Sequence, residues 1–313
     1  MTAFEGAHAL VTGAGRGIGR ATAVALAQAG ANVSLLARSQ DELEETAELV
    51  RGRGRVANVA RADLGDTDQV PQAIAAVLRE LGDVDILINN AAVVWPLGPT
   101  PRTDPHELQL AFAINVFAPM SFARALVPGM LDRGWGRVIN VSSGIVARPE
   151  AMLGMNVYAA TKAALEAHTA NLAAEVDGSG VTVNVYRPGS VDTRMQEWIR
   201  AQPPERIGEE LHTSFIANER DGNLISPKHR QRLSFVASRE KTTARSGGSM
   251  PETRTPIGDQ VRQMRAAAEG RGEPGNAFTR KQAARAAAES PGEAFPLGAA
   301  APRPRRTGSS SHH

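Results

Sequence analysis

The stretch Thr12-Gly13-Ala14-Gly15-Arg16-Gly17-Ile18-Gly19 lies between a short apolar run and a segment with helical spacing. Glycine lets a backbone turn sharply and approach a ligand closely, and the first N–H groups of a helix attract an anion. A glycine-rich turn alone is weak evidence, because it can be purely structural. Its place between a strand and a helix favours a site for a pyrophosphate group.

Outward from this turn, residues 1–227 alternate short apolar runs with amphipathic segments. We expect strands at 7–11, 32–36, 56–59, 85–88, 137–141 and 181–185, and helices at 18–29, 41–50, 66–81, 105–117 and 157–174. Six strands separated by helices predict an α/β fold with a Rossmann-like, doubly wound parallel sheet. Ligands of such sheets bind beyond the carboxyl ends of the strands.

The charge of the chain is divided between two regions. Residues 1–227 hold 19 Lys and Arg against 26 Asp and Glu, whereas residues 228–313 hold 16 against 7. The second region contains only eight Val, Ile, Leu or Phe residues. So little apolar material cannot offset the conformational entropy lost on folding. We therefore expect a domain at 1–227 and a basic, low-complexity, disordered tail at 228–313, which arises from a reading-frame change or is a natural appended segment.

Composition excludes several other classes of protein. The 313 residues contain no cysteine, which excludes disulfides and thiolate metal sites and is typical of a reducing compartment. The histidines are scattered, so we expect no metal site. No apolar run approaches the roughly 18 residues of a membrane span, and no secretory signal is visible. We expect a cytoplasmic protein without a membrane or nucleic-acid partner; the arginines of the tail are read as solvated.

The end of the second strand bears on the choice of a dinucleotide. NAD-binding folds place a carboxylate there to bind the ribose 2′-hydroxyl. This chain has Ala37-Arg38, and a guanidinium can pair with a phosphate instead. Arg16 is a second candidate, although both arginines could be ordinary solvated groups. The sequence thus favours NADP over NAD, and Asp63 is either an adenine acceptor or part of a helix-capping turn.

Tyr158 and Lys162 are spaced to share one face of a predicted helix. Lys162 is the only lysine in residues 1–227, and Tyr158 is one of two tyrosines in the chain. A cation within about 4–6 Å lowers the pKa of a phenol by roughly 1–3 units. We therefore expect Lys162 to lower the pKa of Tyr158 and make it a general acid–base group.

Together these motifs resemble the short-chain dehydrogenase/reductase family. The likeness spans about residues 5–195 and adds Asn89-Asn90-Ala91, Asn115, Ser143 and Pro188-Gly189 with Thr193, in the family's order. The resemblance implies NAD(P)-dependent oxidation of an alcohol or reduction of a carbonyl by hydride transfer. By the same resemblance Tyr158 exchanges the substrate proton, and Ser143, rather than Ser142, holds the carbonyl oxygen. Lys162 and Asn115 complete the implied catalytic set, Asn115 through an ordered water.

The resemblance also implies a set of cofactor-binding residues. They are Thr12, Gly13, Gly15, Arg16, Gly17, Ile18, Gly19, Arg38, Asp63, Leu64, Asn89, Ala91, Tyr158, Lys162, Pro188, Gly189, Val191 and Thr193.

The chain departs from the family pattern at three places. Ala92 replaces a glycine beside the cofactor site, and the loop 144–156 is longer than in most members. After Ile225-Ser226-Pro227 the apolar periodicity stops, so the usual seventh strand cannot be identified. Family members often build a dimer or tetramer through this region, and its loss weakens the expectation of a homo-oligomer.

The segments that flank the substrate in the family are mostly apolar here. Val94, Trp95, Leu153, Met155, Met195 and Trp198 are the candidate substrate-binding residues. They favour an apolar alcohol or carbonyl compound, although they could also pack beneath a lid expected at 196–219. The leading hypothesis is an NADP-preferring oxidoreductase that interconverts a secondary alcohol and a ketone, or a primary alcohol and an aldehyde. The alternatives are a non-catalytic NADP(H)-binding protein and a family member impaired by its altered C-terminus.

Overall fold

The computed structural model describes residues 3–227. The expected basic tail, 228–313, lies outside them.

The chain alternates strands and helices along the described part. The elements are β1 (His8–Thr12), α1 (Gly17–Gln28), β2 (Asn32–Ala37), α2 (Gln40–Arg51), β3 (Ala57–Arg61), α3 (Gln69–Leu81), β4 (Ile86–Asn89), η1 (Thr100–Arg102), α4 (Pro105–Phe112), η2 (Ala113–Phe117), α5 (Ala118–Asp132), β5 (Gly136–Val141), η3 (Gly144–Ala147), η4 (Pro149–Ala151), α6 (Asn156–Glu175), β6 (Val181–Tyr186), α7 (Arg194–Arg200), α8 (Pro204–Ile207) and α9 (Glu209–Arg220).

The six strands form one parallel sheet in the order β3-β2-β1-β4-β5-β6. The order reverses direction between β1 and β4, as expected for a doubly wound sheet, and the predicted fold class is confirmed. Ligands in such sheets bind at the carboxyl ends of the strands beside this reversal. The turns after β1, β4 and β5 all lie at that edge.

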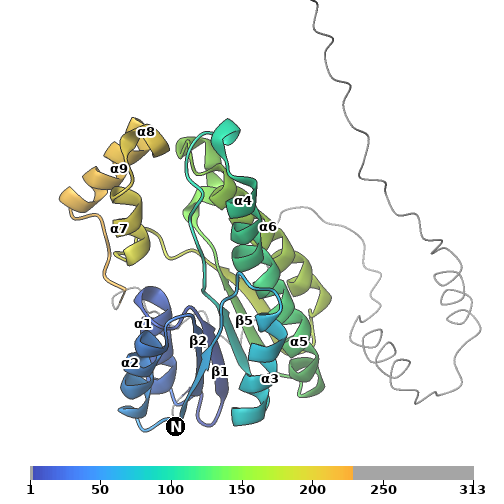
Figure 1. Cartoon of the computed structure of the whole chain (residues 1–313). Coiled ribbons are helices and arrows are strands. Elements are labelled where there is room, and N and C mark those ends of the chain that lie inside the picture. Colours follow the sequence, from blue (N-terminus) through green and yellow to red (C-terminus); the bar gives the residue numbers. More distant parts are fainter. Residues whose placement is uncertain (1–2, 228–313) are drawn as a thin grey trace, which may run out of the picture. The chain divides into compact units, whose positions relative to one another are not determined.

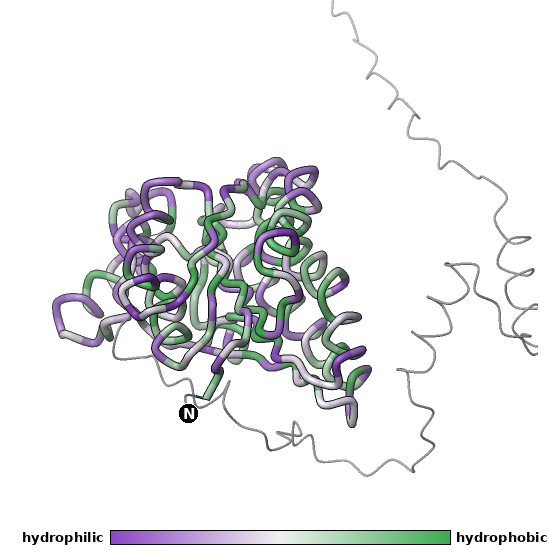
Figure 2. The backbone as a smooth tube through the Cα atoms, turned by 90° about the horizontal axis from the view of Figure 1, so that it is seen from below, coloured by the Kyte–Doolittle hydropathy of each residue, from purple (hydrophilic) through white to green (hydrophobic). Residues whose placement is uncertain are grey.

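Alternate residues along the strands pack into two hydrophobic cores, one on each face of the sheet. In β1, Ala9 and Val11 pack with α1 and α2 on one face, whereas Leu10 packs with α3 and α5 on the other. Figure 1 shows α1 and α2 on one side of the sheet and α3, α5 and α6 on the other. Figure 2 shows apolar residues gathered along the sheet and hydrophilic residues on the outer turns. Such two-sided burial requires the continuous apolar runs that identified the strands.

The helix predicted at 105–117 is longer than the sequence pattern indicated. It continues through the π-helical η2 into α5 and ends at Asp132, although Pro128 lies inside it. Prolines and a glycine interrupt the helical pattern of α5, which explains why the prediction stopped early. By length and composition Pro105–Asp132 could cross a membrane, but 61% of its apolar window is buried inside the fold, as in a core helix.

After β6 the chain forms α7, α8 and α9, where a lid was expected at 196–219. These helices lie beyond the carboxyl end of the sheet (Figure 1). Ile225 returns to make a single parallel bridge with Val191, and no seventh strand forms within the described residues.

Candidate active site

The glycine turn after β1 is a cradle that side chains would fill. Gly13 and Gly17 have positive φ angles of 63° and 55°, which favour glycine. A Cβ added to Gly19 would collide with the carbonyl oxygen of Gly13. Helix α1 then begins without a side-chain cap at Arg16 and without an acidic residue in its first turn. Uncapped N–H groups beside an open backbone cradle fit the pyrophosphate of a dinucleotide.

Thr12 joins the turn to the end of β4. Its hydroxyl oxygen accepts hydrogen bonds from the backbone N–H groups of Asn90 and Ala91, each at 3.0 Å. The Asn90 amide donates in return to the carbonyl oxygen of Thr12 at 2.9 Å. These bonds hold the turns after β1 and β4 together at the reversal of strand order.

Opposite charges alternate along what we call the charged edge, formed by Arg16, Arg38, Glu42, Asp63 and Arg194. The Glu42 carboxylate pairs with Arg16 at 3.1 Å and with Arg194 of α7 at 2.9 Å. Arg38 and Asp63 approach only to 4.0 Å, and the Arg38 side chain is 63% exposed. The edge is therefore open to solvent and rich in cations.

Asp63 and Leu64 follow β3 with different roles. One Asp63 carboxylate oxygen accepts from the backbone N–H of Gly65 at 2.9 Å, which makes a local turn. The cap of α3 is Asp68, so Asp63 caps no helix. Leu64 is buried in the core that α3 and α5 share.

Four side chains one turn apart form what we call the α6 face: Tyr158, Lys162, Glu166 and Thr169. Tyr158 hydrogen-bonds with the Ser143 hydroxyl, and the Lys162 ammonium donates to the carbonyl oxygen of Val141 at 2.8 Å. The next two side chains continue the pattern: Glu166 accepts from the Ser142 hydroxyl at 2.6 Å, and Thr169 accepts from the Asn140 amide at 2.8 Å. The face is thus bonded step by step to the end of β5.

This arrangement separates the two candidate serines. Ser143 pairs with Tyr158, whereas the Ser142 hydroxyl donates a hydrogen bond to Glu166. Asn140 in turn accepts from the Asn89 amide at 2.8 Å, so the network reaches β4.

The pKa of Tyr158 differs in direction from the expectation. Its side chain is 8% exposed, and burial raises the pKa of Tyr158 to about 12, with the Ser143 hydrogen bond opposing the rise. Burial also lowers the pKa of Lys162 to about 8, opposed by the nearby Glu166 carboxylate. The Lys162 ammonium lies 5.7 Å from the Tyr158 ring centroid. Desolvation outweighs the attraction because both groups are removed from water, so Tyr158 holds its proton at neutral pH.

Asn115 lies in the π-helical segment and is fully buried. Its amide oxygen accepts from the N–H of Val93 and its amide nitrogen donates to the carbonyl of Val93, both at 2.8 Å. It also donates to the Thr161 hydroxyl at 3.0 Å. The side chain therefore ties the segment after β4 to α6, and within the described residues it forms no hydrogen bond with Lys162.

The turn expected beside the nicotinamide follows β6. Pro188 is buried, Gly189 has a φ of 75°, and Val191 is fixed by its bridge to Ile225. Thr193 lies next to Gly17, since a Cβ on that glycine would come within 3.4 Å of its methyl group. The turn after β6 and the glycine turn are therefore neighbours.

Four of the six candidate substrate-binding residues gather around Tyr158. Val94 and Met155 are buried with it, and Met195 and Trp198 pack against the same cluster. Ile199, Ile207, Leu211 and Phe215 of α7, α8 and α9 belong to the same cluster. The lid helices thus cover the phenol with apolar side chains.

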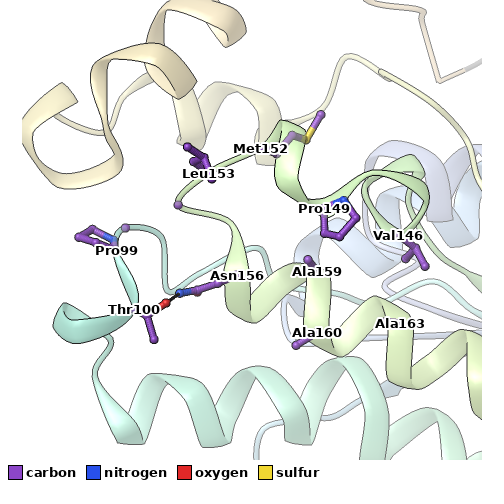
Figure 3. A pocket seen from close by; sticks show the side chains of 12 residues that line it. Pro99, Thr100, Val146, Pro149, Met152, Leu153, Asn156, Ala159, Ala160 and Ala163 are labelled. Carbon is purple, nitrogen blue, oxygen red and sulfur yellow. Dashed lines mark hydrogen bonds between the residues drawn. The ribbon is translucent and has the colours of Figure 1, made fainter.

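Trp95 and Leu153 do not join this cluster. Trp95 packs against the core beneath α3 and α5. Leu153 is 69% exposed and lines a cavity of about 630 Å³ with Pro99, Met152 and Ala160. Figure 3 shows this cavity between the η1 turn, the loop before α6 and the alanine side of that helix. Tyr158 does not line it.

Several residues of the site were not singled out from the sequence. Glu166 follows Lys162 by one helical turn, so its place on the same face could have been noticed. Glu42 and Arg194 meet from positions 152 residues apart, and no local pattern signals such a pair. Among the described residues no group of His, Asp and Glu could hold a metal ion.

A family model described as "short chain dehydrogenase" matches residues 7–204, more than half of the chain. The chain belongs to the short-chain dehydrogenase/reductase family. Enzymes of this family act on CH–OH groups with NAD(P).

Individual relatives show how far the similarity extends. A short chain dehydrogenase of Pseudocercospora fijiensis is 36% identical over 195 residues, which are 61% of this chain and 62% of that protein. Gluconate 5-dehydrogenase of Gluconobacter oxydans is 36% identical over 201 residues, 63% of this chain and 76% of that enzyme. The structure of L-sorbose reductase from Gluconobacter frateurii, complexed with NADPH and L-sorbose, has a TM-score of 0.65 at 28% identity, covering 75% of this chain and 89% of that one.

Proposed function

We propose that residues 1–227 form an NADP(H)-dependent oxidoreductase domain that interconverts a secondary alcohol and a ketone, or a primary alcohol and an aldehyde. One observation carries the proposal: the protonated Tyr158 hydroxyl is hydrogen-bonded with Ser143 and buried beside Lys162, at the sheet edge that carries the glycine turn. A phenol with an ordinary structural role does not need a buried ammonium next to it, because burying a charge costs free energy.

In this proposal the protein handles the proton and the developing charge on oxygen. A bound NADP(H) supplies or accepts the hydride. The Ser143 hydroxyl holds the substrate oxygen, and Tyr158, protonated at neutral pH, gives that oxygen its proton in the direction of reduction. The Lys162 ammonium, held by the carbonyl of Val141, favours the negative charge that Tyr158 then carries.

Cations at the charged edge support NADP as the preferred cofactor. Ala37 presents no carboxylate, and Arg38 is exposed and only loosely paired with Asp63. Arg16 is paired with Glu42, which a 2′-phosphate would have to displace. Since an arginine binds a phosphate through two parallel hydrogen bonds, Arg38 is the stronger candidate to bind it. The related L-sorbose reductase was solved with NADPH.

The cluster around Tyr158 supports an apolar substrate. Val94, Met155 and Met195 offer no hydrogen-bonding side chains for the hydroxyls of a sugar or sugar acid, although two relatives are named for such substrates. We propose a small ketone or aldehyde with an aliphatic or aromatic substituent, taken up in the cytoplasm when α7–α9 move aside.

The test is to follow the absorbance of NADPH and of NADH with a panel of apolar ketones and aldehydes, and with fructose and sorbose. The proposal predicts oxidation of NADPH by at least one apolar carbonyl compound, faster than with NADH. NADPH binding without turnover on any compound would instead support the non-catalytic alternative, and turnover on sugars alone would contradict the apolar substrate.

A further inference from the structure

Glu166 lies where three segments of the site meet, and no role above requires it. It extends from α6 one turn after Lys162, and its side chain is only 15% exposed. It accepts a hydrogen bond from the hydroxyl group of Ser142, the neighbour of Ser143, at 2.6 Å. Arg187, the residue before the Pro188-Gly189 turn, donates to it through Nε at 2.8 Å and also through Nη2.

Two-point ion pairs also form at Arg55–Glu5 and Arg220–Asp221, but there the carboxylate side chains are 53% and 48% exposed, against 15% for Glu166. Both carboxylate oxygens are used, and the serine hydroxyl adds a third hydrogen bond. A guanidinium that meets a carboxylate through two parallel bonds fixes orientation as well as distance. The partners come from α6, from the end of β5 and from the exit of β6, so one side chain fixes all three segments relative to one another.

We propose that Glu166 is a positioning residue. It holds Ser142, and with it the neighbouring Ser143, on the substrate side of the site, and it holds Arg187, which precedes the Pro188-Gly189 turn, on the cofactor side. It also supplies the negative charge that faces Lys162. The inference rests on the proposed function, because it concerns the same reaction. Glu166 touches neither Tyr158 nor the place of hydride transfer, so it acts through its neighbours.

Few charged groups surround Lys162, so the direction in which each substitution changes the pKa of Lys162 can be predicted. Its own helix presents Tyr158 and Glu166, and Arg187 from the β6 side pairs with Glu166. In the described chain, β5 offers Lys162 the carbonyl of Val141, and the π-helical segment bonds to α6 through the uncharged amide of Asn115. Removing Glu166 lowers the pKa of Lys162, whereas removing Arg187 strengthens the field of Glu166 and raises it.

The experiment compares Glu166→Gln and Arg187→Gln with wild type in the full chain, using Glu175→Gln as the matched control. Glu175 is an exposed carboxylate at the end of the same helix. The readouts are the pH profile of kcat with NADPH and an accepted ketone, the Kd of NADPH by fluorescence, and the melting temperature.

We expect Glu166→Gln to lower kcat on the order of tenfold at neutral pH, less than loss of the proton donor itself. In the pH profile of kcat, the fall at alkaline pH should move down by about one pH unit in Glu166→Gln, because the pKa of Lys162 is lowered. In Arg187→Gln it should move up by about half a unit. Both variants should weaken NADPH binding several-fold, and Glu175→Gln should match wild type in every readout. Arg187 is exposed, so Arg187→Gln keeps the test valid even if Glu166→Gln fails to fold.

The proposal is overturned if the alkaline fall of kcat stays at the wild-type pH in both Glu166→Gln and Arg187→Gln, or if the Kd of NADPH for these two variants equals that of Glu175→Gln. If wild type turns over no carbonyl compound, the proposed function fails. The measured Kd of NADPH then still decides whether Glu166 positions the Pro188-Gly189 turn.

Discussion

The charged edge and the α6 face belong to the same proposed site but are built in opposite ways. At the edge, Arg16 pairs with Glu42 at 3.1 Å, Arg38 approaches Asp63 only to 4.0 Å, and most of the Arg38 side chain is exposed. On the α6 face, Lys162 is 2% exposed and every neighbour has a fixed partner. Exposed ion pairs contribute about 0–1 kcal/mol, whereas breaking a buried pair costs roughly 3–5 kcal/mol.

The difference suits the charged edge to selecting the cofactor and the α6 face to the proposed proton transfer. A weakly paired edge lets an incoming phosphate replace a carboxylate at little cost, so this region is suited to choosing between cofactors. A dry, fully bonded face holds the proposed proton-transferring groups in one geometry and keeps Tyr158 protonated. Substitutions on the α6 face should therefore reduce turnover strongly, and substitutions on the edge should change cofactor preference modestly.

The largest effect is expected for Lys162→Met, which removes the buried ammonium and keeps the volume of the side chain. Turnover should fall by roughly 10²–10⁴-fold, the range for loss of an acid–base contribution. Steady-state kinetics with NADPH measure this loss, and Arg79→Met on the exposed side of α3 is the control. Turnover within threefold of wild type would remove Lys162 from the mechanism.

The next largest effect is expected for Gly19→Ala at the glycine turn. The added methyl group collides with the carbonyl oxygen of Gly13, and such overpacking costs about 1–3 kcal/mol. The melting temperature should fall, and the Kd of NADPH should rise by roughly tenfold to a hundredfold, measured by fluorescence titration. Gly144→Ala, with open space around the new Cβ, should melt like wild type. Unchanged NADPH binding in Gly19→Ala would show that the cofactor lies elsewhere.

The smallest effect is expected for Arg38→Ala on the charged edge. The ratio of kcat/KM for NADPH to that for NADH should fall about tenfold, because an exposed guanidinium contributes little more than about 1.4 kcal/mol. Raising the salt concentration should weaken the wild-type preference in the same direction. Arg51→Ala, in an exposed pair with Glu44, is the control. An unchanged ratio would leave Arg16 as the remaining candidate.

Local patterns were enough to predict the sheet and the glycine turn. The strands are buried on both faces, so their apolar runs are continuous, and β1 and β5 were located to within one residue. Tyr158 and Lys162 could be paired because one helical turn separates them. Helix α5 was missed because Pro128 interrupts its pattern, and tertiary packing overrides that signal.

What the sequence could not supply depends on burial and on long-range contacts. The direction of the Tyr158 pKa follows from desolvation, which no spacing of residues reveals. The exposure of Leu153 and the packing of Trp95 into the other core depend on how the loops close over the sheet. The Glu42–Arg194 pair joins α2 to α7 only after folding.

The central claim is that the buried phenol of Tyr158 gives the substrate its proton. The most direct test is turnover of NADPH with an accepted ketone by Tyr158→Phe, beside Tyr186→Phe and with NADPH binding measured on both. The account predicts a loss of at least about 10²-fold in Tyr158→Phe, with NADPH affinity unchanged and with Tyr186→Phe close to wild type. Turnover by Tyr158→Phe at the wild-type rate would contradict it.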